Sequence, residues 1–303
     1  MELRTIRAFV AVVEQGGFSR AARVLFASQP TVSKAVKQLE EELGVALLAR
    51  PGRGVAVTEA GEAVLRRGRA MLAEAEDLQR ELDELRGLKR GSLRLGLPLF
   101  GSSILFAPLF AAFRSRWPGV DIGLEEHGSK RLEALLLAGR TDLAAVLAPD
   151  PAKFQWQAVR TEPLVALLPA GHRLAGRARV DLGDLAAEPL VLYEQGFALN
   201  QILQEACRRR GFAPTVAARS GQDDFILELV AAGVGVGFFP RIVAERQPHP
   251  GVRAVLLDEP RTEWRIVFAW RRGGYLSQAA RAWLALAREM HPEAAGDGAL
   301  SGN

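Results

Sequence analysis

The chain begins with apolar residues at helical spacing, and glycines divide them into short segments. The first segment predicts a helix ending at glycines 16–17, from apolar residues Leu3, Ile6, Phe9, Val10 and Val13. The next stretch, residues 19–44, predicts two helices joined by a turn at Phe26 and Ala27. We expect the first helix to pack behind this pair, which together would form a helix-turn-helix unit.

The second helix of the pair has a defined start, apolar stripe and end. Ser28 is placed to cap its N-terminus, and Pro30 lies in the first turn, where a missing N–H costs nothing. Gly44 is a natural stop, because glycine readily adopts the left-handed conformation after a helix. By the same logic Ser19 is predicted to cap the preceding helix. The stripe consists of Val32, Val36, Leu39 and Leu43, with Ala35 beside it.

The opposite face of this helix is polar and basic. It carries Gln29, Thr31, Ser33, Lys34 and Lys37. In a major groove, glutamine can bind adenine, and lysine can bind guanine or neutralise a phosphate. The same pattern also fits an ordinary amphipathic helix with a solvated face, so the following residues decide between the two interpretations.

Residues 45–50 and 55–58 predict two short strands around a Gly/Pro turn at 51–54, with Arg50 and Arg53 on the hairpin. A hairpin with arginines directly after such a helix is typical of a wing that contacts the flanking DNA backbone or minor groove. This favours DNA binding over a solvated face.

At this point residues 1–61 closely resemble the DNA-binding domain of LysR-type transcriptional regulators. The resemblance rests on Phe9, Gly17, Ser19, Ala21, Ala22, Leu25, Ser28, Gln29, Pro30, Ser33, Leu39, Glu40, Leu43, Gly44, Leu47, Leu48, Arg50, Thr58 and Gly61. It implies that the DNA contacts are Gln29, Pro30, Thr31, Lys34, Arg50 and Arg53. The family often has arginine where Lys34 stands, and a lysine does not make the bidentate guanine contact of arginine.

Thr58 is placed to cap a long helix running to about residue 87. Two interleaved seven-residue series predict a coiled-coil seam: Val64, Met71, Leu78, Leu85 and Gly61, Gly68, Ala75, Leu82. The small Gly68 and Ala75 would let a partner helix approach closely. A helix packed only on its own domain is the alternative. In the LysR-type family this position is the dimerising linker helix.

From Ser92 onward, strands and helices alternate, which predicts a parallel α/β sheet. We expect strands at 93–97, 120–125, 143–148, 162–168, 190–193, 216–218, 234–238 and 264–270, and helices at 102–117, 129–138, 199–210, 223–232 and 277–290. The resemblance extends to about residue 290. It implies two lobes joined by two crossing strands, with a cleft between them.

Ligands in open α/β sheets bind beyond the strand C-termini, against helix N-termini. Backbone N–H groups and hydroxyls at such a place can hold a carboxylate. The residues placed there, which line the effector pocket by resemblance, are Phe100, Gly101, Ser102, Ser103, Ser129, Tyr193, Gln195 and Phe197. Helix capping alone is the alternative role for each serine. The absence of acidic neighbours beside Ser102 and Ser103 favours a small organic anion.

The composition indicates the cellular compartment, and it argues against a disulfide and a membrane-spanning segment. The chain has 303 residues and a net charge of +4, with eight Lys/Arg against five Asp/Glu through Thr58, a local net of +3. One cysteine, Cys207, excludes an intrachain disulfide and favours a reducing compartment; a small core residue is the favoured role over a redox sensor. The longest apolar stretch, residues 97–113, is too broken to span a membrane. We therefore expect a cytoplasmic protein.

Catalysis is not expected. The histidines, His127, His172, His249 and His291, are scattered and form no metal-ligand motif. We therefore expect no catalytic residues, no metal and no cofactor. Two alternatives stay open: a DNA-binding protein whose C-terminal domain is purely structural, or a solute-binding or enzyme-like two-lobed domain.

The predicted fold combines α+β and α/β parts. Its domains are a winged helix-turn-helix (1–58), a linker helix (59–88), a two-lobed effector domain of the type II periplasmic-binding-protein kind (89–161 with 266–290, and 162–265), and a tail (291–303). The implied partners are double-stranded DNA with an inverted repeat, a small-molecule effector, a second copy of the chain in a homodimer or homotetramer, and RNA polymerase. No membrane partner is expected.

Overall fold

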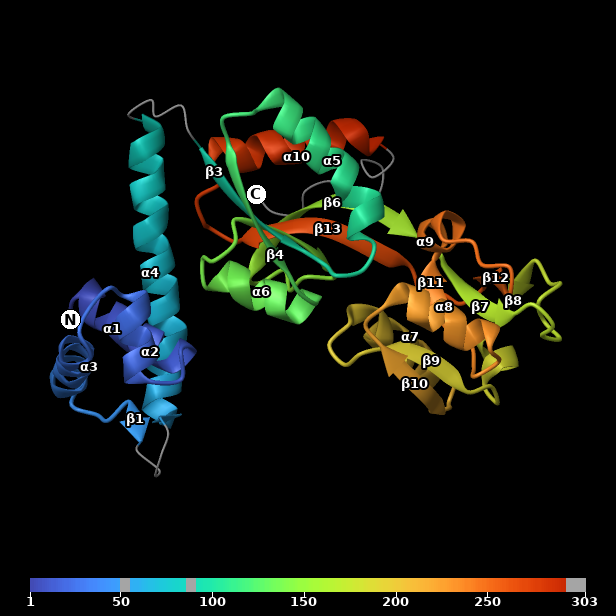
Figure 1. Ribbon diagram of the computed structural model, residues 1–303, viewed down its shortest axis with the longest axis horizontal. Coiled ribbons are helices and arrows are strands. Elements are labelled where there is room, and N and C mark those ends of the chain that lie inside the picture. The colour runs from blue at the N-terminus through green and yellow to red at the C-terminus, as the bar shows by residue number, and fades with distance from the viewer. Residues whose placement is uncertain (50–54, 86–90, 293–303) are drawn as a thin grey trace. The chain divides into compact units, whose positions relative to one another are not determined.

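The computed structural model describes residues 1–49, 55–85 and 91–292, and the side chains of residues 83–85 are not described. The chain divides into two compact units (Figure 1). The first is Met1–Leu88 with Leu137–Arg140, and the second is Lys89–Leu136 with Thr141–Asn303.

The first unit contains the predicted helix-turn-helix. Its elements are α1 (Leu3–Glu14), α2 (Phe18–Val24), α3 (Gln29–Leu43), β1 (Leu48–Ala49), β2 (Ala56–Val57) and α4 (Glu59–Leu85). β1 pairs antiparallel with β2, so both strands of the expected wing are present, although they are shorter than predicted. The helices enclose one core in which Phe9, Leu39 and Leu47 are fully buried.

The caps of two helices agree with the prediction. The Ser28 hydroxyl accepts a hydrogen bond from the Thr31 N–H at 3.3 Å, and the Thr58 hydroxyl accepts one from the Gly61 N–H at 2.9 Å. Gly44 ends α3 in the left-handed conformation, with φ of 70°. The prediction for Ser19 is wrong, because α2 begins one residue earlier and Ser19 lies inside its first turn.

α4 presents two different faces. Leu65 and Leu72 belong to the core of the first unit, and a Cβ atom on Gly68 would lie 2.7 Å from Ile6 Cγ2. Gly68 therefore allows α1 of the same chain to approach, and its predicted role in admitting a partner helix is wrong. On the other face, Met71 and Leu78 are exposed, at 39% and 59%.

The second unit begins with a lobe built on a five-stranded sheet of order β4-β3-β5-β13-β6. Its elements are β3 (Ser92–Leu97), α5 (Ser102–Arg116), β4 (Asp121–Glu126), α6 (Ser129–Leu137), β5 (Leu143–Leu147), β6 (Phe154–Glu162), β13 (Trp264–Arg271) and α10 (Gln278–Met290). Alternate residues of β5 face opposite sides of the sheet. Ala145 packs in the core with α5 and α10, and Val146 packs in the core with α6.

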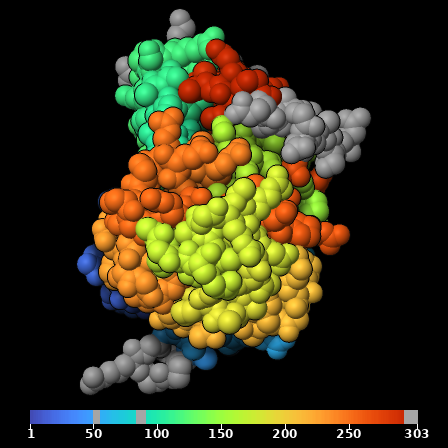
Figure 2. Space-filling model, turned by 90° about the vertical axis from the view of Figure 1, so that its right-hand side faces the viewer, coloured from blue at the N-terminus to red at the C-terminus, as the bar shows by residue number. Residues whose placement is uncertain are grey.

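The second lobe contains a four-stranded sheet of order β11-β7-β12-β8 and a parallel pair of β9 and β10. Its elements are β7 (Leu164–Pro169), β8 (Arg179–Val180), a 3-10 helix (Leu182–Leu185), β9 (Leu190–Tyr193), α7 (Ala198–Arg209), β10 (Val216–Ser220), α8 (Asp223–Ala231), β11 (Gly237–Pro240), α9 (Arg241–Arg246) and β12 (Val252–Leu257). β12 pairs with both β7 and β8, and yellow-green and orange residues of this lobe lie side by side on the face shown in Figure 2.

The sheets differ from the prediction in two ways. β3, β4 and β5 are parallel, but β13 runs antiparallel to both β5 and β6, so the sheet is mixed. In addition, the strand expected at 162–168 starts only at Leu164, after Pro163, and β6 before it was missed. β6 is rich in polar residues and, among the strands in the described part of the chain, pairs with β13 alone, which weakens its apolar signal. β8 and β12 were missed as well.

Candidate functional site

The exposed face of α3 is the polar face that the sequence predicts. Val32 and Val36 are buried against the rest of the unit, at 2% each. The exposed residues are Ser28, Gln29, Pro30, Thr31, Lys34 and Lys37, and Ser33 is half-buried. Because Ser28 and Pro30 set the start of α3, the exposed amide, hydroxyl and ammonium groups gather on its first two turns.

Glu40 fixes the start of the wing relative to this helix. Its carboxylate accepts hydrogen bonds from the Leu47 N–H at 2.7 Å and the Leu48 N–H at 3.1 Å. Sequence reasoning assigned no role of its own to Glu40. The predicted contacts Arg50 and Arg53 lie outside the described residues.

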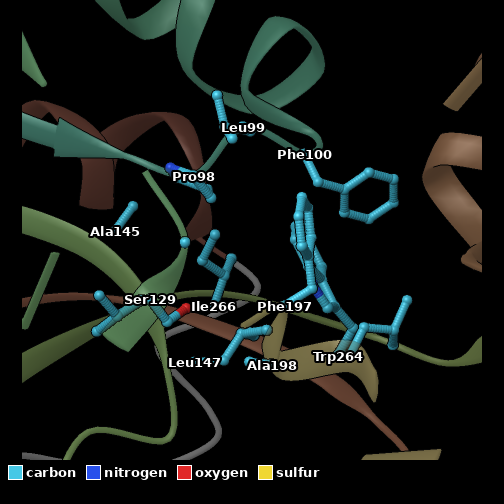
Figure 3. Close-up of a pocket in the computed structure, with 13 residues that line it drawn as sticks. Pro98, Leu99, Phe100, Ser129, Ala145, Leu147, Phe197, Ala198, Trp264 and Ile266 are labelled. Atoms are coloured by element: carbon cyan, nitrogen blue, oxygen red, sulfur yellow. The ribbon is translucent and has the colours of Figure 1, made fainter. Parts of the chain in front are cut away.

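The second unit contains a pocket where its two lobes meet (Figure 3). The lining residues are Pro98, Leu99, Phe100, Gly128, Ser129, Ala145, Val146, Leu147, Phe197, Ala198, Leu199, Trp264 and Ile266. They come from the loop after β3, the end of β5, the start of β13 and the N-termini of α6 and α7. No lining side chain is charged.

The pocket is small. Its cavity volume is about 30 Å³, which is room for one or two water molecules. At its edge, a Cβ atom on Gly128 would lie 3.2 Å from the carbonyl oxygen of Gly196, so the two lobes touch backbone to backbone. An organic ligand therefore enters only if the lobes part or the lining side chains turn.

Ser129 supplies the polar side chain of this apolar pocket. It is 7% exposed, and Figure 3 shows its oxygen directed toward the lining residues. The nearby start of α7 has Phe197 at the N-cap position and no side-chain cap. A hydroxyl and backbone N–H groups are therefore present at an otherwise apolar site.

Two family models match the chain and together cover most of it. Residues 3–62 match the bacterial regulatory helix-turn-helix protein model of the lysR family, and residues 86–292 match the LysR substrate binding domain. This chain belongs to the LysR family of transcriptional regulators.

Relatives and solved structures of this LysR-type regulator agree in length and fold. The HTH-type transcriptional regulator YwbI of Bacillus subtilis is 33% identical over 285 residues, covering 94% of this chain and 95% of its own. The RuBisCO operon transcriptional regulator of Allochromatium vinosum is 32% identical over 302 residues, covering 96% and 98%. A full-length OxyR variant from Pseudomonas aeruginosa covers 95% of both chains at 25% identity, with a TM-score of 0.73.

The pocket of this LysR-type regulator includes part of the predicted set. Phe100, Ser129 and Phe197 line it, while Gly101, Ser102, Ser103, Tyr193 and Gln195 do not. Ser102 donates its hydroxyl to the Pro98 carbonyl, and Ser103 and Gln195 are exposed. Gly101 has φ of 74° and packs against Trp264, where a Cβ atom would lie 3.3 Å from the indole.

Sequence reasoning missed the apolar lining at the ends of β5 and the start of β13. Their positions in the sheet could have indicated this lining, because Leu147 ends a parallel strand and Ile266 lies on the strand that pairs with it.

Within residues 1–49, 55–85 and 91–292, no group of three or more His, Cys, Asp or Glu side chains is placed to hold a metal. In that same part of the chain, no helix is both long and apolar enough to cross a membrane.

Proposed function

We propose that the pocket lined by Phe100, Ser129 and Phe197 binds the effector of this LysR-type regulator, and that the effector is a small, mostly apolar molecule with one anionic group. The observation that carries the proposal is the Ser129 hydroxyl, the polar side chain of an otherwise apolar pocket that also includes the uncapped start of α7. A carboxylate oxygen accepts from such a hydroxyl and from uncapped helix N–H groups, whereas an ammonium group does not.

Binding would act through lobe geometry, without catalysis. The pocket is too small for an organic acid, so an effector would favour a conformation with more space between Phe100 and Phe197. We place the lobe boundaries at 89–161 with 266–290 and at 162–265. DNA would be contacted by Ser28, Gln29, Pro30, Thr31, Ser33, Lys34 and Lys37, joined by Arg50 and Arg53.

Dimerisation is proposed through the exposed apolar stripe of α4. Its residues are Met71, Ala75, Leu78 and Leu82, flanked by Val64; the side chain of Leu85, the next in the series, lies outside the described residues. A contiguous apolar stripe on a long charged helix is typical of a coiled-coil partner surface. Two DNA-binding units would then contact an inverted repeat in the cytoplasm, with a tetramer and RNA polymerase as further proposed assemblies.

The effector class is tested by thermal shift with benzoate, benzamide and benzylamine, followed by a panel of small carboxylates. We expect carboxylates to raise the Tm and the matched amides and amines to have no effect. Ser129→Ala should weaken the binding of the best carboxylate roughly 10- to 150-fold, consistent with loss of a charge-assisted hydrogen bond of roughly 1.5–3 kcal/mol. Ser103→Ala is the matched control and should leave binding unchanged. Binding that prefers the amine, or survives in Ser129→Ala at full strength, contradicts the proposal.

A further inference from the structure

Tyr193 is held firmly by its backbone at the end of β9. Its carbonyl oxygen accepts hydrogen bonds from Asn200 Nδ2 at 2.8 Å and from Arg219 Nη1 at 3.1 Å. Asn200 lies in α7 and Arg219 in β10, so three elements fix the position of this residue. The Tyr193 side chain is 2% exposed and does not line the pocket.

The ring of Tyr193 supports two walls of the pocket from behind. It stacks on Phe197, with ring centroids 4.9 Å apart and planes 15° apart, and it packs against Phe100 at 4.9 Å and 57°. Phe197 belongs to the second lobe and Phe100 to the first. A rotation of the Tyr193 ring therefore moves aromatic walls on both sides of the pocket, because close-packed rings cannot move independently.

The hydroxyl of Tyr193 is tied to a carboxyl group away from the pocket. It donates to Asp223 Oδ1 at 3.1 Å, and Asp223 is the first residue of α8. The carboxyl thus joins the ring to α8, which has no residue in the pocket.

We propose that Tyr193 and Asp223 are a positioning pair for the effector pocket, in which the Asp223 carboxyl holds the ring that supports Phe100 and Phe197. This inference rests on the proposed function of the pocket as the effector site. With this pair, the shape of the pocket depends on whether the Asp223 carboxyl at the start of α8 is protonated. Conversely, α8 responds when an effector displaces the aromatic walls.

The surroundings of the pair give it a measurable signature. Burial raises the pKa of Asp223 to about 6, with Asp224 adding to the effect, and burial also raises the pKa of Tyr193. The carboxyl therefore changes from a neutral to a charged acceptor between about pH 5 and 7, and a charged acceptor makes the stronger hydrogen bond. The other charged or titratable side chains on α8 and on the strands packed against it are Asp224, Glu228, Arg219 and Arg253, and Glu194 and His249 lie in the adjoining loops.

The chain has two tyrosines, which allows a direct test on the full-length protein. In a Tyr275→Phe background labelled with 3-fluorotyrosine, the single fluorine resonance reports on Tyr193. We expect it to shift with a midpoint near pH 6. Asp223→Asn, which keeps an acceptor but does not titrate, should hold the resonance in its native range and remove the shift. Asp224→Asn and His249→Gln should retain it. A resonance that does not titrate, or still titrates in Asp223→Asn, overturns the proposal.

A second resonance tests whether the Tyr193–Asp223 pair affects the pocket itself. Trp264 lines the pocket and packs edge-on against Phe100, with ring centroids 6.0 Å apart. With 5-fluorotryptophan, the Trp264 resonance is the one missing in Trp264→Phe. We expect it to titrate with the same midpoint in the wild type and to lose that dependence in Tyr193→Phe. A pH-independent Trp264 resonance overturns the positioning role. Because no ligand is added, failure here is distinct from failure of the carboxylate screen.

Discussion

The face of α3 proposed to bind DNA and the pocket proposed to bind the effector use side chains in opposite ways. On α3 the polar residues Gln29, Thr31 and Lys34 are exposed, while the apolar ones are buried at 2% or less in Val32, Val36 and Leu39. In the pocket the apolar residues form the binding surface, and Ser129 is the polar side chain among them. The first site is one face of a single helix, whereas the second is assembled from five segments.

This difference explains why local pattern identifies one site better than the other. Helical periodicity separates the two faces of α3 in the sequence itself, so the exposed residues follow directly. No periodicity shows which serine of two helix starts faces a pocket. Ser102 and Ser129 both begin helices, yet Ser102 donates to the Pro98 carbonyl and Ser129 lines the pocket.

The largest expected effect tests whether exposed apolar residues on a helix also mark a binding surface. Met71→Glu with Leu78→Glu should convert the proposed dimer to a monomer, because unpaired charges buried at an interface cost about 3–5 kcal/mol. Light scattering should show half the wild-type mass. Arg66→Glu with Arg67→Glu, at exposed polar positions of the same helix, should keep the dimer. A double glutamate variant at wild-type mass would place the dimer contact elsewhere.

The next effect concerns the exposed polar face of α3. Gln29→Ala should lose about 1–3 kcal/mol of discrimination at one base pair, because its amide is placed to contact a base edge. A binding-site selection measures this. Gln38→Ala is the matched control, since Gln38 lies on the same helix but bonds to Glu42 at 3.0 Å. If both variants select the wild-type sequence, Gln29 does not contact a base.

A smaller effect concerns the carboxyl behind the pocket. The pKa of Asp223 is raised in the folded state to about 6, from 3.8. Its contribution to stability is therefore complete below about pH 4 and is lost as pH rises through 6. The side chain is partly exposed, so we expect roughly 1 kcal/mol after screening.

Asp223→Asn should remove this dependence, so the Tm difference between variant and wild type should shift in favour of the variant from pH 5 to 7.5. Scanning calorimetry at several pH values measures it. Asp224→Asn, at the exposed neighbouring position, should keep the pH dependence with a slightly lower midpoint, because Asp224 is the smallest of the causes that act on Asp223. A constant difference between Asp223→Asn and wild type across this range would mean that Asp223 has an ordinary pKa.

The smallest expected effect concerns Cys207. Its side chain is fully buried in α7, and burial raises the pKa of its thiol, which lowers the thiolate fraction. We expect peroxide to leave DNA affinity within about twofold of the untreated value, and Cys207→Ala to behave alike. Mass spectrometry should find the thiol unoxidised. A peroxide-dependent change that disappears in Cys207→Ala would show a redox role.

The sequence alone determined most of the first unit. The helix starts at Ser28 and Thr58, the stop at Gly44 and the exposed face of α3 all depend on interactions within a few residues, which a local pattern records. The same holds for β9 and α8, whose predicted and observed limits agree within one residue.

Tertiary structure decided the rest, because it depends on contacts between distant segments. Gly68 lets α1 of the same chain pack closely on α4, and β13 runs antiparallel to β5. Tyr193 lies behind the pocket that it was predicted to line. In each case the result depends on which helix or strand packs beside the residue or strand in the folded chain. Phe100, Tyr193 and Trp264 are far apart in the sequence and meet only after both lobes have folded. Their contacts depend on how the two lobes pack together, and no local backbone preference determines them.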